Sequence, residues 1–155
     1  MTIKFDVLNR FTGAVQFTAE IECDEGASVS VKLGLAVRWA VKARAYLADA
    51  DLAGADLADA NLAYANLAGA EWRDGITVTR APIQVYGLAY PIAILDAHMQ
   101  IGCELHTFDE WDGFDDERIS QMDGVNARRF WRDHKSSLMA LCRLRAAKKE
   151  LAGVE

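Results

Sequence analysis

The sequence has few cysteines, few prolines and no long apolar run, and each shortage excludes a class of protein. Cys23, Cys103 and Cys142 are odd in number and lie far apart, which excludes a disulfide framework and favours a reducing cytosol. No segment reaches the ~18 uninterrupted apolar residues of a membrane-spanning helix. The first residues also lack the apolar core of a signal peptide. We therefore expect a soluble cytoplasmic protein that makes no contact with a membrane.

Positive charge is also in short supply. The chain has 17 Lys and Arg against 23 Asp and Glu, a formal net charge of −6, which argues against binding of duplex DNA by the whole molecule. Hydrophobic residues make up 52% and charged residues 26%, a balance typical of folded globular chains. With 155 residues the chain is long enough to bury a core. We expect one compact unit with three segments, residues 1–44, 45–74 and 75–155.

The sequence patterns of common catalytic sites are missing as well. The chain has no phosphate-binding glycine loop, nucleophile elbow or metalloprotease helix. Cys103, His106, His134 and Cys142 are zinc-binding residue types, but His134 and Cys142 would lie about 12 Å apart along a helix. We predict no catalytic residue, no cofactor and no stoichiometric metal. A zinc-dependent or acid–base enzyme stays open as an alternative, which elemental analysis of the wild type and of Cys103→Ser would test.

A period of five residues runs from position 45 to position 74, written AYLAD ADLAG ADLAD ANLAY ANLAG AEWRD. In an α-helix, at about 100° per residue, the central residue of each unit would turn by about 140° from the last and scatter around the cylinder. That helix would be apolar on every side and would also carry Asp51, Asp56 and Asp59. The period therefore excludes an amphipathic α-helix.

An extended chain suits the same pattern. Within each unit Ala and the central residue are two positions apart, so both side chains point to one side of a short strand. The remaining residues turn the corner, and stacking of the units buries the apolar side chains that a single unit cannot bury. The central residues, which we expect to point inward, are Leu47, Leu52, Leu57, Leu62, Leu67 and Trp72.

The A(D/N)Lxx pattern resembles the pentapeptide-repeat family. The resemblance implies a right-handed quadrilateral β-helix with one unit on each of four sides, so that Leu47 stacks with Leu67 and Leu52 stacks with Trp72. The six units would form about one and a half coils, a very short stack at the ~4.8 Å spacing of strands. Both ends of such a stack need covers.

The flanking segments predict the remaining elements of an α+β fold. Residues 3–8 and 14–22 alternate apolar and polar side chains around a Thr12-Gly13 corner, which predicts a hairpin. Ser28 or Ser30 begins a helix that continues to the first repeat, covers one end of the stack and has an apolar face. That face comprises Val31, Leu33, Leu35, Ala36, Trp39 and Ala40.

The C-terminal segment predicts strands followed by helices. Short strands are expected over residues 76–80, 83–90, 92–98 and 99–104, interrupted by Pro82 and Pro91. Thr107 and Glu110 form a capping box, and Asp115 or Asp116 begins a second helix that Gly124 ends. The longest helix then spans 126–152, with an apolar stripe comprising Phe130, His134, Leu138, Leu141 and Cys142.

Charge is strongly segregated along the chain. Residues 45–74 carry six acids against Arg73, residues 102–123 carry eight acids against Arg118, and residues 126–149 carry eight bases against Asp133. The acidic and basic segments either face each other or are solvated. Alternatively, they bind partners. The candidate partner-binding residues are Arg128, Arg129, Arg132 and Lys135 on the basic helix, and Asp51, Asp56 and Glu71 on the repeats; Arg143 and Lys149 extend the basic helix.

Residues 5–72 also resemble small pentapeptide-repeat proteins of tailed phages and prophages. That resemblance implies a non-enzymatic accessory protein that acts by binding in the cytoplasm of a bacterial host, plausibly by inhibiting a host factor such as a defence component. One alternative is an acidic DNA mimic that acts on a topoisomerase or another DNA-binding protein. A second alternative is an oligomer that sequesters a small anionic nucleotide. We expect a homodimer, because so short a stack exposes much edge for little core.

Overall fold

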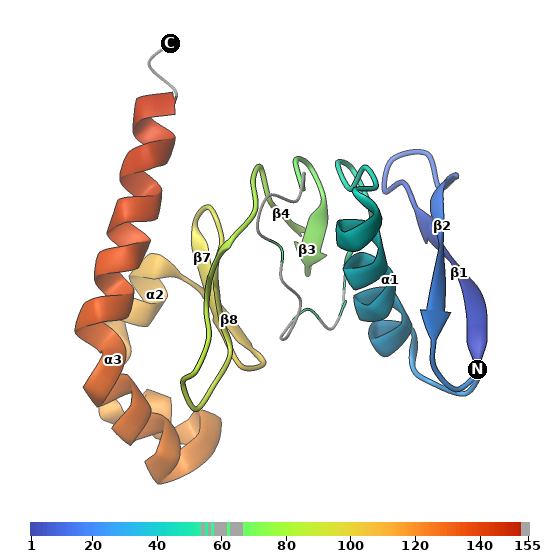
Figure 1. Cartoon of the computed structure of the whole chain (residues 1–155). Helices are drawn as coiled ribbons and strands as arrows, with labels where there is room; N and C mark the ends of the chain where they lie inside the picture. The colour runs from blue at the N-terminus through green and yellow to red at the C-terminus, as the bar shows by residue number, and fades with distance from the viewer. Residues whose placement is uncertain (54, 56, 58–61, 63–66, 153–155) are drawn as a thin grey trace. The chain divides into compact units, whose positions relative to one another are not determined.

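The structure is a computed structural model that describes the whole chain except residues 54, 56, 58–61, 63–66 and 153–155. It is a mixed α+β fold with a hairpin, small sheets and a long C-terminal helix, which confirms the predicted class at that level. The chain divides into two compact units, Met1–Pro82 and Ile83–Glu155 (Figure 1).

The first unit begins with the predicted hairpin. Strand β1 (Thr2–Leu8) pairs antiparallel with β2 (Val15–Glu22), and Gly13 adopts the positive φ of 69° that the turn requires. The pairing shifts by one residue between Val7 and Leu8. This bulge turns Val15 outward, although the alternation of the sequence places it with the inward side chains.

Helix α1 (Val29–Ala43) packs against the inner face of this hairpin. Ser28 is the N-cap, and its hydroxyl accepts a hydrogen bond from the Val31 amide. Of the two predicted helix starts, Ser28 and Ser30, the structure has the first. Trp39 stacks with Phe17 of β2 at 6.2 Å between ring centroids. The predicted apolar face is wrong at Val31, which is exposed, and omitted Val37, which is fully buried.

The repeat segment buries its central residues. The side chains at the predicted inward positions are all at most 6% exposed: Leu47, Leu52, Leu57, Leu62, Leu67 and Trp72. Asp51 forms a parallel bridge with Glu71, and the Leu52 amide donates to the Glu71 carbonyl at 3.0 Å. The two bridged residues are twenty positions apart, which is the offset of four five-residue units.

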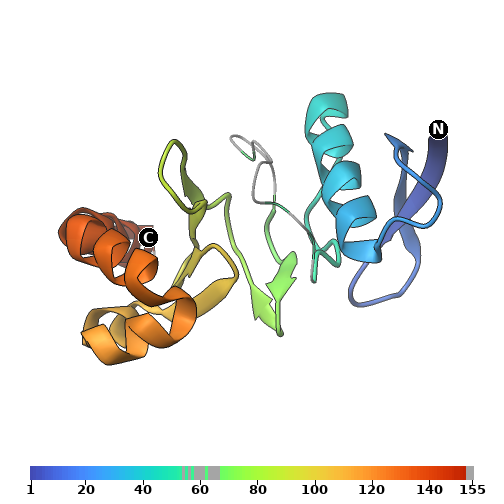
Figure 2. The same cartoon turned by 90° about the horizontal axis from the view of Figure 1, so that it is seen from below.

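The paired backbone of the repeats is covered on both sides. On one side, the Asp51 amide donates to the Leu8 carbonyl, and Asn9 bridges Ala50. On the other side, Gly69 and Ala70 exchange hydrogen bonds with Val78, just after the small hairpin of β3 (Glu71–Arg73) and β4 (Ile76–Thr77). Within this unit, α1 lies between the β1–β2 hairpin and β3–β4 in both cartoon views, as expected of a cover (Figures 1 and 2).

The second unit contains a four-stranded antiparallel sheet in sequential order. Its strands are β5 (Ile83–Val85), β6 (Ile92–Ile94), β7 (His98–Ile101) and β8 (Glu104–Thr107). Pro82 and Pro91 each stand directly before a strand, where their missing amide interrupts no pairing. The predicted strand over 99–104 is wrong at its end, because Gly102 (φ 57°) turns the chain and starts β8. The predicted strand over 83–90 ends early, at Val85.

Helices α2 (Phe108–Gly113) and α3 (Asp116–Ala152) follow the sheet. Thr107 and Glu110 form the predicted capping box, and the Asp115 carboxylate accepts from the Arg118 amide to begin α3. At Gly124 (φ 61°, ψ −140°) the helical backbone is broken, so α3 consists of two helices, as predicted.

Aromatic, aliphatic and sulfur-containing side chains of the sheet and both helices form the core of the second unit. Trp111 and Met99 lie at its centre, and the Trp111 indole donates to the Met99 carbonyl at 2.7 Å. Phe130 and Trp131 pack in this core, as their helical spacing predicts. Within the described residues, no helix combines the length and the apolar character needed to cross a membrane.

Candidate functional site

The predicted basic surface lies on the second half of α3. The backbone is non-helical at Asp123 and Gly124, so the second half of α3 is a separate helix that begins at Val125. Arg128 and Arg132 are four residues apart and therefore share one side of the helix, with Arg129 beside them. Buried Phe130 and Trp131 hold the opposite side in the core. With the two aromatic rings in the core, Arg129 and Arg132 are exposed and Arg128 is half-buried.

Two of the predicted basic residues are paired with the acidic segment. Arg132 Nη2 lies 2.7 Å from Asp116 Oδ2. Lys135 Nζ donates to the Asp112 carbonyl at 2.6 Å and lies 3.7 Å from its carboxylate. At these positions the acidic and basic segments face each other, which was the simpler of the two expectations for their charge.

Arg128 and Arg129 differ from their neighbours. Within the part of the chain that the structure describes, neither guanidinium has a hydrogen bond or an ion pair. Both line a surface hollow with Val125, whose side chain is 58% exposed, and with Asp133. We call Val125, Arg128 and Arg129 the arginine face. It offers two donor groups and an apolar contact on a rigid helix.

On the repeats, the acidic candidates Asp51 and Glu71 already accept hydrogen bonds from nearby backbone amides. The Asp51 carboxylate accepts from the Ala53 amide at 3.1 Å, and the Glu71 carboxylate accepts from the Gly75 amide at 3.0 Å. Both side chains therefore stabilise turns of their own segment. Asp56 lies outside the described residues. The repeats and the arginine face belong to different units, so neither unit combines the two sets of predicted residues.

The titratable side chains near α2 also have structural partners. His106 Nε2 lies 2.8 Å from a Glu104 carboxylate oxygen, and its ring packs edge-on against Trp111. A hydrogen bond from the Thr107 amide lowers the pKa of Glu110. Burial raises the pKa of the Cys142 thiol to about 11. Among the described residues, no group of three or more His, Cys, Asp or Glu side chains is arranged to hold a metal ion.

One buried ion pair was not predicted from the sequence. Arg145 Nη2 lies 3.1 Å from Asp96 Oδ1, and both side chains are at least nine-tenths buried. The signal available in the sequence is the helical spacing of Leu138, Cys142 and Arg145, which places the arginine on the buried stripe. Among so many bases on this helix, that spacing is the one feature that separates a core arginine from a surface one.

The comparisons with known proteins bear on the repeat segment. Residues 43–71 match the family model of pentapeptide repeats in eight copies. This segment carries pentapeptide repeats. The match confirms the predicted repeat, with bounds shifted slightly from residues 45–74. No curated protein and no solved structure matches the chain.

Proposed function

We propose that this protein acts by binding rather than by catalysis, and that the arginine face of α3 holds an acidic segment of a partner protein. The observation that carries the proposal is the difference between neighbours on one helix. Arg132 and Lys135 are neutralised by Asp116 and Asp112, whereas Arg128 and Arg129 lack partners among the described residues. An exposed valine beside unpaired guanidinium groups suits a carboxylate flanked by apolar residues.

The chemistry favours a protein partner over a nucleic acid. A guanidinium fork matches a carboxylate in a bidentate pair, and two such forks suit a short acidic segment. Long polyanions would also meet the acidic residues of α2 and of the start of α3, in a chain with a net charge of −6. A compact acidic segment avoids that repulsion. The expected setting, a phage accessory protein that inhibits a host factor, remains part of this proposal.

For the repeats we propose the finer architecture that their family resemblance implies, a right-handed quadrilateral β-helix of about one and a half coils. The buried central residues and the twenty-residue offset between Asp51 and Glu71 support it. In this proposal the short coil is a rigid scaffold. The DNA-mimic alternative is less favoured, because Asp51 and Glu71 already accept backbone hydrogen bonds.

The test uses a fluorescein-labelled hexaglutamate peptide and fluorescence anisotropy at low and high salt. We expect binding to wild type to weaken with salt, and Arg128→Glu/Arg129→Glu to weaken it at least about tenfold. The matched control is Lys42→Glu/Arg143→Glu, which changes the net charge equally at exposed positions outside the arginine face. Equal losses in the two double variants would mean that only net charge matters and would contradict the proposal.

Two further measurements address the alternatives. Inhibition of DNA gyrase supercoiling by the wild-type protein, unchanged in Arg128→Glu/Arg129→Glu, would favour the DNA mimic. A nucleotide retained in native mass spectrometry would favour sequestration. The same spectra, with light scattering at micromolar concentration, test the predicted homodimer: a mass near that of one 17.1 kDa chain at every concentration would contradict it.

A further inference from the structure

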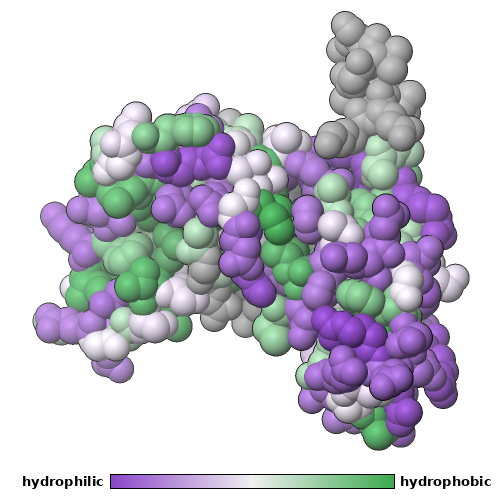
Figure 3. Space-filling view, turned by 180° about the vertical axis from the view of Figure 1, so that it is seen from behind, coloured by the Kyte–Doolittle hydropathy of each residue, from purple (hydrophilic) through white to green (hydrophobic). Residues whose placement is uncertain are grey.

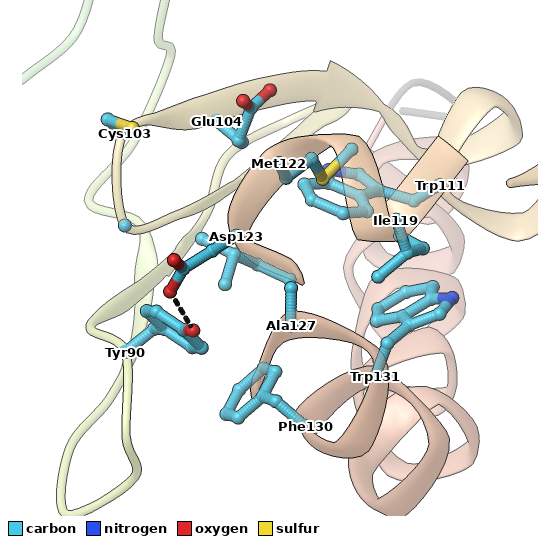
Figure 4. Close-up of a pocket in the computed structure, with 12 residues that line it drawn as sticks. Tyr90, Cys103, Glu104, Trp111, Ile119, Met122, Asp123, Ala127, Phe130 and Trp131 are labelled. Atoms are coloured by element: carbon cyan, nitrogen blue, oxygen red, sulfur yellow. Dashed lines mark hydrogen bonds between the residues drawn. The ribbon is translucent and has the colours of Figure 1, made fainter. Parts of the chain in front are cut away.

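A cavity of about 270 Å³ lies within the second unit, among Tyr90, the turn between β7 and β8, α2 and both halves of α3 (Figure 4). Two of its sides are aromatic. Trp111 and Trp131 form one side with ring centroids 5.2 Å apart. Tyr90 and Phe130 meet edge to face at 5.0 Å and form another. The cavity is therefore a slot with two aromatic sides, and Ile101, Ile119, Met122 and Ala127 complete its apolar lining.

The walls are held in place by contacts outside the slot. The polar edge of Trp111 is occupied by its hydrogen bond to the Met99 carbonyl. Trp111, Phe130 and Trp131 are each at most 7% exposed and belong to the core. A molecule entering the slot would thus meet ring faces in fixed positions, with little side-chain entropy left to lose.

The rim of the cavity carries negative charge. Among its lining residues the two with charged side chains are both acids, Glu104, whose carboxylate lies 2.8 Å from His106 Nε2, and Asp123. The Tyr90 hydroxyl donates to Asp123 Oδ2 at 2.5 Å (Figure 4), and this hydrogen bond raises the pKa of the tyrosine. Asp123 Oδ1 accepts no hydrogen bond from the described residues. The nearby base Arg129 lines a different hollow that shares Tyr90 and Phe130.

The break in α3 at Asp123 and Gly124 sets the position of the Asp123 carboxylate. Asp123 has the extended φ of −150° and Gly124 the positive φ of 61°, so the chain leaves helical geometry just where the carboxylate reaches Tyr90. A continuous helix would carry the side chain at a different angle. The break therefore places the exposed Asp123 carboxylate at the edge of the slot, beside Tyr90.

We propose that this cavity binds a small aromatic amine, with its ring between the tryptophan side and the side formed by Tyr90 and Phe130, and with the protonated amine against Asp123 and the face of an aromatic ring. Carboxylates attract the ammonium group directly, and the electron-rich faces of Trp and Tyr attract it as well. The volume is slightly below the about 300 Å³ at which sites for larger ligands begin, which suits a ligand of one ring. This inference is independent of the arginine face.

The probe is 2-phenylethylamine, with 2-phenylethanol and phenylacetate as neutral and anionic analogues of nearly the same shape. Titration calorimetry on the full chain at neutral pH measures each affinity. We expect the amine to bind at least about tenfold more tightly than the alcohol, since one charge-assisted hydrogen bond separates them. We expect the acid to bind more weakly than either. Equal affinities for all three, or no binding of the amine, would overturn the proposal.

Variants locate the site. Asp123→Asn keeps the shape and the Tyr90 contact but removes the charge, so the preference for the amine over the alcohol should disappear. Glu117→Gln removes one exposed acid from the same helix outside the cavity and should leave the preference unchanged. Ala127→Leu fills the slot and should abolish binding, with Met122→Trp as a second filling variant if the first lowers the melting temperature. Unchanged binding by a folded filling variant would place the ligand elsewhere and reject the cavity.

Discussion

The first unit buries leucines that recur every five residues, whereas the second buries tryptophans, phenylalanines and methionines with no period at all. In the first unit, neighbouring segments are joined by backbone hydrogen bonds, such as those between Ala50, Leu52 and Glu71. In the second, four antiparallel strands and two helices meet through large side chains. Repetition makes a scaffold of similar positions, while an irregular core makes positions that differ from one another. A cavity, two arginines without a partner among the described residues, and a buried ion pair all occur in the irregular unit.

The surfaces differ in the same way. Hydrophobic residues are prominent on the visible face of the first unit, and hydrophilic residues dominate that of the second (Figure 3). Most exposed large apolar side chains belong to the first unit: Met1, Leu8, Phe11, Val15, Val29, Val31 and Tyr46, against Tyr86, Val125 and Leu144 in the second. Since Leu8 and Val15 pair across the hairpin, part of this apolar surface is contiguous.

The largest expected effect comes from Leu57→Asp. Leu57 is 6% exposed, and an unpaired carboxylate at this buried position costs several kcal/mol, comparable with the stability of a small domain. We expect the first unit to unfold while the second stays folded. Circular dichroism should lose part of its signal, while Cys142 should stay unreactive to a thiol reagent because burial raises its pKa to about 11.

The control for this variant is Ala53→Asp, which adds the same charge at an exposed position of the repeat segment. It should melt like wild type. If Leu57→Asp also melts like wild type, the inward assignment of the central leucines is wrong. If Cys142 becomes reactive in Leu57→Asp, the two units unfold together and the comparison between them fails for stability.

Arg145→Met should have the next largest effect, and on the second unit. The substitution removes the guanidinium group that lies 3.1 Å from the buried Asp96 carboxylate, and breaking a buried ion pair costs about 3–5 kcal/mol. Urea unfolding followed by tryptophan fluorescence and by Cys142 reactivity measures the loss. The double variant Asp96→Asn/Arg145→Met should recover part of it, because the uncompensated charge is gone. A single variant as stable as wild type would show that the pair is dispensable.

Thr107→Ala should cost about 1 kcal/mol, since it removes the hydroxyl that accepts from the Glu110 amide in the capping box. Thr107→Ser retains that hydroxyl and should stay close to wild type. Both are measured by urea unfolding of the second unit. If the alanine and serine variants are equally destabilised, the loss comes from packing of the threonine methyl group rather than from the cap.

The smallest effect should appear in acid. The hydrogen bond from the Thr107 amide lowers the pKa of Glu110 in the folded protein, so its stabilising contribution is present above the ordinary carboxyl pKa and is lost as pH falls through the lowered value. The difference in stability between wild type and Glu110→Gln should therefore shrink as the pH is lowered through the acid range. A difference that is constant with pH would exclude this carboxylate as its source.

How far the sequence predicts this fold depends on whether a feature is local. Ser28, the Thr107–Glu110 box and Gly124 act on their immediate neighbours, and the structure has each helix boundary where they place it. The inward leucines were predictable because a period of five leaves one consistent arrangement. These features need no knowledge of distant contacts.

Features that depend on distant partners were missed or wrong. Strand β8 has no alternating pattern and pairs because the turn at Gly102 returns it to β7. Arg145 is a core residue because Asp96, 49 positions earlier, meets it. Of the predicted binding residues, the sequence could not separate Arg128 and Arg129 from Arg132 and Lys135, because the aspartates that pair with the latter lie on other helices or helix halves.

The pairing of Asp51 with Glu71 also bears on which insertions and deletions the repeat segment can accept during evolution. In the proposed four-sided coil, gaining or losing twenty residues would return the remaining repeat units to equivalent neighbours, because the bridged residues are twenty positions apart. In the same proposal, a change of five residues would keep the sequence pattern intact but move the following repeat units onto a different side of the coil. The sequence repeats every five residues, but the length change that would preserve the proposed arrangement is twenty residues.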